Sequence, residues 1–258
     1  TAVDMMRFSD QSLFRNAGHE DLDYVVVKWL ASSEVEEYLA ELPEIVGRFS
    51  RLSCVHVIEH QTDPTIGYVP NLRAMMNEGF ARGFQLNEYA GLVNTDVYFG
   101  PQWLGNLVRY AEPGRVINSL HITAVPLAAM QHAKVGIVNE DLGVPEPDKF
   151  NQARFDELFW KHYADNLITA REIDGPGGWR QVATMPYLFH RKWWEACGPW
   201  ATTFDWQHQA PSPDECFFAR IAEAGAEFAL VESSIIYHAE GVERKGNRPK
   251  GAEHLSEE

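Results

Sequence analysis

The chain has 258 residues, of which 45% are hydrophobic and 23% are charged, as is usual for a soluble globular protein. This length suits one large α/β domain or two small ones. The formal net charge of −15 argues against nucleic acid or anionic lipid as a partner, because like charges repel.

The sequence carries no signal for membrane insertion or export. No apolar run approaches the ~20 residues needed to cross a bilayer. The segment TAVDMMRFSDQ at the start lacks the basic and apolar regions of a signal peptide. Cys54, Cys197 and Cys216 show no CxxC spacing, which predicts buried thiols in a reducing compartment. We therefore expect a cytoplasmic protein without a transmembrane segment.

Strands and helices alternate in the first half of the chain. Residues 22–30, LDYVVVKWL, predict a strand, and Ser33 followed by Glu36 forms a capping box that predicts a helix through Glu44. The pattern then predicts a strand over 52–58, a loop over 60–70, a helix over 71–82, a strand over 89–93, a helix over 101–110 and a strand over 116–125. This alternation of strands and helices predicts a mainly parallel sheet whose two faces are covered by helices.

The second half is less regular. We expect a loop over 140–148, an amphipathic helix over 155–167, a hinge at the glycine-rich residues 174–178, a strand over 182–189, a short helix over 192–196, a helix over 214–223 and a strand over 228–237. Gly225 is the expected C-cap of the helix over 214–223. No repeat or linker divides the chain, so a single domain is predicted.

The triplet Asn94-Thr95-Asp96 directly follows an apolar strand. In open α/β sheets, ligands bind beyond the carboxyl ends of the strands. A carboxylate there can hold a hard divalent cation, which in turn binds diphosphate oxygens. Taken alone, Asp96 fits a turn or an N-cap better than it fits a metal ligand.

Three further polar groups lie at element ends. The acidic pair Asp214 and Glu215 opens a helix, where it either stabilises the helix dipole or supplies a general base. His238 ends the last strand, either as a metal ligand or as a histidine bonded to backbone. Glu59 and Asp63 follow the second strand, either to bind a nucleotide or as ordinary loop residues. No GxGxxG, Walker A, GxSxG or HExxH motif is present.

The order of these features, over about residues 24–241, resembles the family-2-like GT-A glycosyltransferases. Residues 71–108, NLRAMMNEGFARGFQLNEYAGLVNTDVYFGPQWLGNLV, resemble that family's Asn-containing helix, strand, Asp-X-Asp-type triplet and Trp-Leu helix start. Residues 187–206, YLFHRKWWEACGPWATTFDW, resemble its Arg and aromatic before a Gly-Gly-Phe-Asp turn. Residues 213–238, PDECFFARIAEAGAEFALVESSIIYH, resemble its acidic pair, helix, Arg, Gly and strand ending in His.

The sequence departs from the family pattern at three places. The triplet begins with Asn94 in place of an aspartate, and the acidic pair is Asp-Glu after a proline where the family usually has Glu-Asp. The spacing to Arg220 and Gly225 favours Asp214 as the base, with Glu215 as its rival. Residues 29–33 lack the family's Asn-containing turn and are a candidate nucleotide contact.

The resemblance implies a GT-A fold with a single Rossmann-like, mostly parallel sheet flanked by helices. The nucleotide-binding half would span about 22–125, the acceptor half about 126–241, and a charged tail 242–258. Asp96 and His238 would hold Mn²⁺ or Mg²⁺. The implied nucleotide-sugar contacts are Glu59, Asp63, Asn71, Asn94 and Asp96.

The implied reaction moves a sugar from a nucleoside-diphosphate sugar to a carbohydrate or other hydroxyl acceptor. Asp214 or Glu215 would act as the base, with inversion at the anomeric carbon. A retaining glycosyltransferase, a nucleotidyltransferase and a non-catalytic sugar-binding domain are the alternatives. A nucleotidyltransferase usually has a Gly-rich loop after the first strand, which is absent. Four tryptophans on the acceptor side are expected either against sugar faces or in the core: Trp193, Trp194, Trp200 and Trp206.

Overall fold

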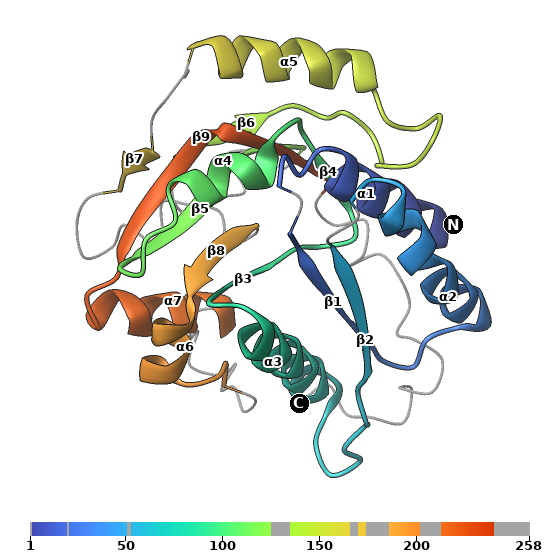
Figure 1. Ribbon diagram of the computed structural model, residues 1–258, viewed down its shortest axis with the longest axis vertical. Coiled ribbons are helices and arrows are strands. Elements are labelled where there is room, and N and C mark those ends of the chain that lie inside the picture. Colours follow the sequence, from blue (N-terminus) through green and yellow to red (C-terminus); the bar gives the residue numbers. More distant parts are fainter. Residues whose placement is uncertain are drawn as a thin grey trace.

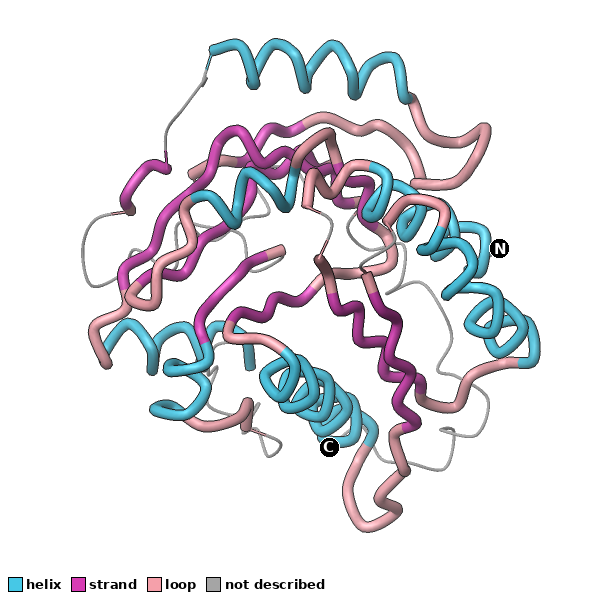
Figure 2. The backbone as a smooth tube through the Cα atoms, viewed as in Figure 1, coloured by secondary structure: helices cyan, strands magenta, loops and turns pink. Residues whose placement is uncertain are grey.

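A computed structural model describes residues 2–19, 21–50, 53–124, 135–165, 170–173, 186–201 and 213–239 (Figures 1 and 2). Its helices are α1 (Ala2–Arg15), α2 (Ser33–Gly47), α3 (Tyr68–Leu86), α4 (Trp103–Arg109), α5 (Gln152–Asp165), α6 (Arg191–Cys197) and α7 (Pro213–Glu223). Its strands are β1 (Asp23–Lys28), β2 (Cys54–Glu59), β3 (Tyr89–Leu92), β4 (Val97–Phe99), β5 (Arg115–Thr123), β6 (Ile137–Asn139), β7 (Ala170–Glu172), β8 (Tyr187–His190) and β9 (Glu227–His238). The predicted α/β class is confirmed.

The strands form two hydrogen-bonded sheets rather than one. β1 and β2 make a parallel pair, and a curled seven-stranded sheet has the order β3-β8-β5-β9-β4, with β6 beside β5 and β7 beside β9 (Figure 1). In the larger sheet only β5·β9 and β5·β6 are parallel, and the other pairings in the described residues are antiparallel. The expected single, mostly parallel sheet is therefore corrected to a mixed one. Strand periodicity reports which face is buried but not strand direction, which depends on distant pairing.

Several element ends follow local chemistry, with shifts from the predicted positions. The N-cap of α2 is Ser32, whose Oγ accepts from Val35 N at 3.4 Å, so the capping serine lies one residue earlier than expected. α3 begins at Tyr68 and carries Pro70 in its first turn. α7 ends at Glu223 as predicted, and Gly225 just beyond it has the positive φ of 93° that glycine adopts after a helix.

Helix α1 was not predicted, and it covers the free edge of β4 (Figure 1). Phe99 N donates to Ser12 Oγ at 3.1 Å, and Asn16 Nδ2 donates to Phe99 O at 2.7 Å. Trp103 Nε1 also donates to Leu13 O at 3.1 Å. These bonds satisfy edge groups that a bare strand would present to another chain. The helix thereby fixes the strand that follows Asp96.

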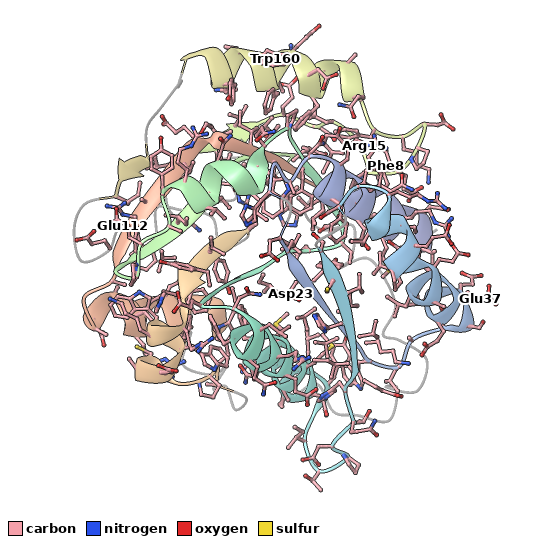
Figure 3. The ribbon with its side chains drawn as sticks, in the orientation of Figure 1. Phe8, Arg15, Asp23, Glu37, Glu112 and Trp160 are labelled. Atoms are coloured by element: carbon pink, nitrogen blue, oxygen red, sulfur yellow. The ribbon has the colours of Figure 1, made fainter. Side chains whose placement is uncertain are left out.

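Among the described residues the core has three apolar clusters, and an aromatic one includes two of the acceptor-side tryptophans. Trp193 and Trp200 are buried at 6% and 4% exposure, and Trp194 packs against the same cluster. Their burial favours the core alternative for these three side chains. Trp206 lies outside the described residues. By contrast, Trp160 on α5 is 61% exposed on the outer surface (Figure 3).

Two expectations from the sequence concern membrane-spanning helices and the cysteines. Among the described helices, none combines the length and apolar character that a membrane crossing requires. No disulfide joins the cysteines, all of which lie in described segments. Cys54 is exposed, and Cys197 and Cys216 are half-buried, so the expectation of buried thiols is wrong for Cys54.

A buried carboxylate links α1 to β1 and α2. Asp10 is 3% exposed, and it accepts from Tyr24 Oη at 2.8 Å and from Tyr38 Oη at 2.6 Å. Burial raises the pKa of Asp10 to about 6, and the two tyrosine hydrogen bonds oppose this effect without cancelling it. The folded state therefore binds a proton more tightly at Asp10 than the unfolded chain does.

We expect Asp10→Asn to flatten the pH dependence of stability. The folded pKa of Asp10 is raised from 3.8 to about 6, so the stability that its protonated form contributes is present at low pH and lost as pH rises through the folded value. Between about pH 4 and about pH 7, the free energy of unfolding should fall by about 2 kcal/mol more in the wild type than in Asp10→Asn. Urea unfolding of both proteins across this range measures the difference, and parallel curves would contradict the prediction.

Candidate functional site

Three chain segments meet at one edge of the larger sheet. The parallel strands β5 and β9 end in register at Thr123 and His238. β4 runs antiparallel to β9, with Val97 opposite His238, and Ala239 N donates to Asp96 O at 3.1 Å. The turn after β3 therefore delivers Asp96 to the carboxyl end of β9, where α/β sheets bind ligands.

Two predicted residues from distant parts of the chain are in contact at this edge. His238 Nε2 lies 3.1 Å from Asp96 Oδ1, and Asn94 Nδ2 lies 3.3 Å from the same ring nitrogen. Asp96 is only 2% exposed. The short Asp96–His238 distance lacks hydrogen-bond geometry, and the buried Oδ1 atom has no hydrogen bond from any described residue. The carboxylate thus keeps a buried oxygen directed at an imidazole.

His238 Nε2 has one donor and one acceptor as neighbours. Asn94 Nδ2 can bond to Nε2 only if Nε2 accepts, whereas Asp96 Oδ1 can bond to it only if Nε2 donates. If Nε2 accepts from the Asn94 amide, its lone pair also faces the lone pairs of Asp96 Oδ1. A cation between Oδ1 and Nε2 would be bound by both lone pairs, with the imidazole proton on Nδ1. The residues therefore fit a divalent ion, since carboxylate oxygen and neutral imidazole are both common metal ligands.

A cation at this site would meet two candidate protein ligands rather than a complete cage. Within the described ranges, no group of three or more histidine, cysteine or acidic side chains is placed to hold a metal. His121 on β5 is buried, and its ring is edge-on to that of His238 with centroids 6.3 Å apart. A cation held by Asp96 and His238 would need further oxygens from a substrate or water, as for ions that bridge a protein to phosphate groups.

A cavity lies at the carboxyl ends of the parallel pair β1 and β2. Its volume is about 320 Å³, which is within the range of small-molecule pockets. Its lining combines one ammonium, two carboxylates, three uncharged polar residues and two apolar ones: Lys28, Leu30, Ala31, Glu36, Glu59, His60, Gln61 and Thr62. Glu59 was predicted at a nucleotide site, whereas Lys28 and Glu36 were not. One sequence feature could have indicated Lys28 as a site residue: it is a charged residue at the end of an apolar strand.

Aromatic and polar contacts fix the residues around this cavity. Trp29 stacks on Tyr68 with ring centroids 5.2 Å apart, and its Nε1 donates to Thr62 Oγ1 at 2.8 Å. The ring of His60 meets Trp29 edge-on at 5.6 Å, and His60 Nδ1 lies 2.9 Å from Glu78 Oε1. The side chains that join β1, β2 and the start of α3 are therefore held in place before any ligand binds.

Asn71 and Asp63 belong to the loop beside this cavity. Asn71 is fully buried, and its Oδ1 accepts from Asp63 N at 2.8 Å while its Nδ2 donates to Gly67 O at 2.9 Å. Asp63 Oδ1 accepts from Thr65 N at 2.8 Å, and the hydrogen bonds from Thr65 lower the pKa of Asp63. Asn71 thus braces the loop through its amide, and Asp63 shapes the turn that follows.

The two candidate bases lie in the first turn of α7, but their side chains fall outside the described part of the chain. The helix itself is anchored: Arg220 Nη2 donates to Pro199 O at 2.9 Å, after α6. The predicted hinge at 174–178 and the charged tail at 242–258 also lie outside the described residues. The structure thus brings Asn94, Asp96 and His238 together, and it places Glu59 at a separate cavity.

Comparisons with known proteins give little guidance. No protein-family model matches the chain, and no curated protein sequence matches it significantly. A crystal structure of GalNAc-T7 with UDP, GalNAc and Mn²⁺ is similar over 89% of this chain, with 12% sequence identity and a TM-score of 0.48. The matched region covers 45% of that protein's chain, so the present chain spans less than half of its length. A likeness at this level assigns no function.

Proposed function

We propose that this chain is a metal-dependent glycosyltransferase of the GT-A kind, which moves a sugar from a nucleoside-diphosphate sugar to a hydroxyl acceptor. The observation that carries the proposal is the contact between Asp96 and His238, in which a buried carboxylate oxygen without a hydrogen bond faces an imidazole nitrogen. The contact lies beyond the carboxyl ends of β5 and β9, as expected for a ligand site in an α/β sheet.

Asp96 and His238 are the proposed ligands of Mn²⁺ or Mg²⁺. When bound, such a cation neutralises the charge that develops on a departing diphosphate. Asn94, whose amide already lies against His238, is proposed to donate to a phosphate oxygen. The cavity beside Glu59 is the proposed place of the nucleoside, with Asn71 and Asp63 holding the adjoining loop. Residues 22–125 would then form the nucleotide half of a single domain.

The proposed chemistry is a displacement at the anomeric carbon. Asp214, or Glu215 as its rival, takes the proton of the acceptor hydroxyl while the oxygen of that hydroxyl bonds to the anomeric carbon. The bond from that carbon to the phosphate oxygen breaks, and the nucleoside diphosphate leaves with the bonding electrons. A base on the face opposite the leaving group gives inversion. Residues 126–241 would supply the acceptor side.

The proposal is tested by calorimetric binding of UDP and GDP with Mn²⁺ and with EDTA. We expect at least one of them to bind about tenfold or more tightly with Mn²⁺, because the ion links the diphosphate to Asp96 and His238. His238→Gln should remove most of this gain, whereas His19→Gln, at an exposed position, should keep it. Donor hydrolysis across a panel of nucleotide sugars then identifies the sugar. Binding that is indifferent to the metal in the wild type would overturn the proposal.

A further inference from the structure

Residues 199–201, which follow α6, are held by side chains from α3 and α7 (Figure 1). Asn77 on α3 pairs with both main-chain groups of Trp200: its Nδ2 donates to Trp200 O at 2.9 Å, and its Oδ1 accepts from Trp200 N at 3.0 Å. Arg73, one turn earlier on α3, donates through Nη1 to Ala201 O at 3.3 Å. Two side chains of one helix therefore fix two consecutive residues of this segment.

The same segment also contacts α7. Arg220 Nη2 on that helix donates to Pro199 O at 2.9 Å. The buried ring of Trp200 packs against Phe80 of α3 with centroids 5.8 Å apart, in the aromatic cluster that also contains Phe217 of α7. Main-chain groups of three consecutive residues are thus bonded by side chains of α3 and α7, and the two helices share one core around the central residue.

The helices α3 and α7 lead to the two groups of the proposed reaction. α3 runs into β3, and the turn after β3 carries Asp96, the proposed metal ligand. α7 carries the candidate bases Asp214 and Glu215 in its first turn. A second tie lies at the C-terminal end of α3, where Arg191 Nη2 at the start of α6 donates to Asn87 O at 2.9 Å. The helix before the metal ligand and the helix with the base are therefore joined through α6 and the segment that follows it.

We infer that Asn77 is a positioning residue for sugar transfer, because its bonds to Trp200 set the place of α7, and of the base that α7 carries, relative to α3. This inference rests on the proposed function, since it concerns the base of the same reaction. An asparagine suits this role because its amide offers a donor and an acceptor side by side, which match the carbonyl and the N–H of one residue. An aspartate here would keep the acceptor but would set its second oxygen against the carbonyl of Trp200.

Asn77→Asp is expected to lower the rate of sugar transfer about 10- to 100-fold, because a displacement of about 1 Å that arises far from the chemistry can cost about 10²-fold. Donor affinity should stay close to that of the wild type, since the proposed donor contacts come from other residues. Single-turnover transfer and calorimetric binding of UDP and GDP with Mn²⁺ measure the two quantities separately. The matched control is Gln85→Glu, which makes the same amide-to-carboxylate change at an exposed position on α3 and should alter neither quantity.

A double-mutant cycle separates positioning of the base from a general structural role. Asn77→Asp is combined with the inactive base variant, either Asp214→Asn or Glu215→Gln. If Asn77 acts through that base, it should lower the residual transfer rate by less than about twofold, because residues that act as a unit are not additive and an absent base cannot be displaced. A further loss as large as that in the wild-type background overturns the inference, since the substitution then acts elsewhere.

Arg220→Met removes the bond to Pro199 O and applies the same test from α7, should circular dichroism show that Asn77→Asp does not fold. Wild-type transfer by the Asn77 variant, or a loss of donor affinity that matches the loss of rate, overturns the inference and leaves the proposed function standing. Full activity of both base variants also overturns it, because α7 then holds no base. Absence of metal-dependent binding of any nucleoside diphosphate by the wild type overturns the proposed function itself.

Discussion

Asp214→Asn is expected to lower the rate of sugar transfer about 10²- to 10⁴-fold, because the variant cannot take the proton of the acceptor hydroxyl. Asp214 lies in the first turn of α7, where the helix dipole stabilises an ionised carboxylate. Affinity for the donor should stay close to that of the wild type, since the proposed nucleotide contacts come from other elements. Single-turnover transfer rates and calorimetric donor binding measure the two quantities separately.

Glu215→Gln is the matched control for this substitution, because it removes the neighbouring carboxylate from the same turn of α7. Adjacent helical residues point in different directions, so one of them should matter far more than the other. If Glu215→Gln is the inactive variant and Asp214→Asn the active one, their roles are exchanged. If both variants transfer sugar at the wild-type rate, a retaining mechanism becomes the better explanation.

Asp96→Asn is expected to abolish the effect of Mn²⁺ on diphosphate binding and to lower transfer by more than about 10²-fold. Substitution of a residue that only hydrogen-bonds to a metal ligand typically lowers metal affinity or activity about 10- to 100-fold. Loss of the ligand itself should therefore lower transfer by more than about that factor. The amide of asparagine keeps the shape of the aspartate side chain but lacks the negative charge that attracts the cation. Titration of the nucleoside diphosphate with and without Mn²⁺ gives the result directly.

Asp156→Asn makes the same chemical change at an exposed position on α5 and should leave metal-dependent binding unchanged. Circular dichroism of both variants separates loss of binding from loss of fold. An Asp96→Asn protein that is folded and still binds GDP or UDP with the wild-type response to Mn²⁺ would remove Asp96 from the metal site.

Much of the fold was predictable from local patterns. Apolar runs located β1, β2, β3, β5 and β9, and breaker residues such as Gly225 located helix ends. The family resemblance implied that Asp96 and His238 hold one metal ion; the two residues are in contact, and shared metal binding stays a prediction. The strand and helix-end predictions succeeded because strand periodicity and glycine conformation are encoded over short stretches of sequence.

The rest depends on contacts between distant segments. β4 has only three residues, Val97–Phe99, too few to show a period, and it exists because it pairs with β9 and receives bonds from α1. The directions of β8 and β9 relative to β5 are likewise set by pairing. The hydrogen bond from Lys28 to Glu36 forms only when α2 packs against β1, so no sequence motif predicted it. In the sequence Ser32-Ser33, either serine could cap a helix, and the structure has Ser32 at the N-cap.

The cover that α1 gives to β4 has a practical consequence for work at the start of the chain. Ser12 and Asn16 bond the edge of the strand that begins directly after Asp96, so a change in the first residues acts on a site far along the sequence. A fusion partner that displaces α1 would leave β4 as an open template for strands of other molecules and would loosen the turn that carries the carboxylate. Affinity tags and immobilisation are therefore better placed away from this helix.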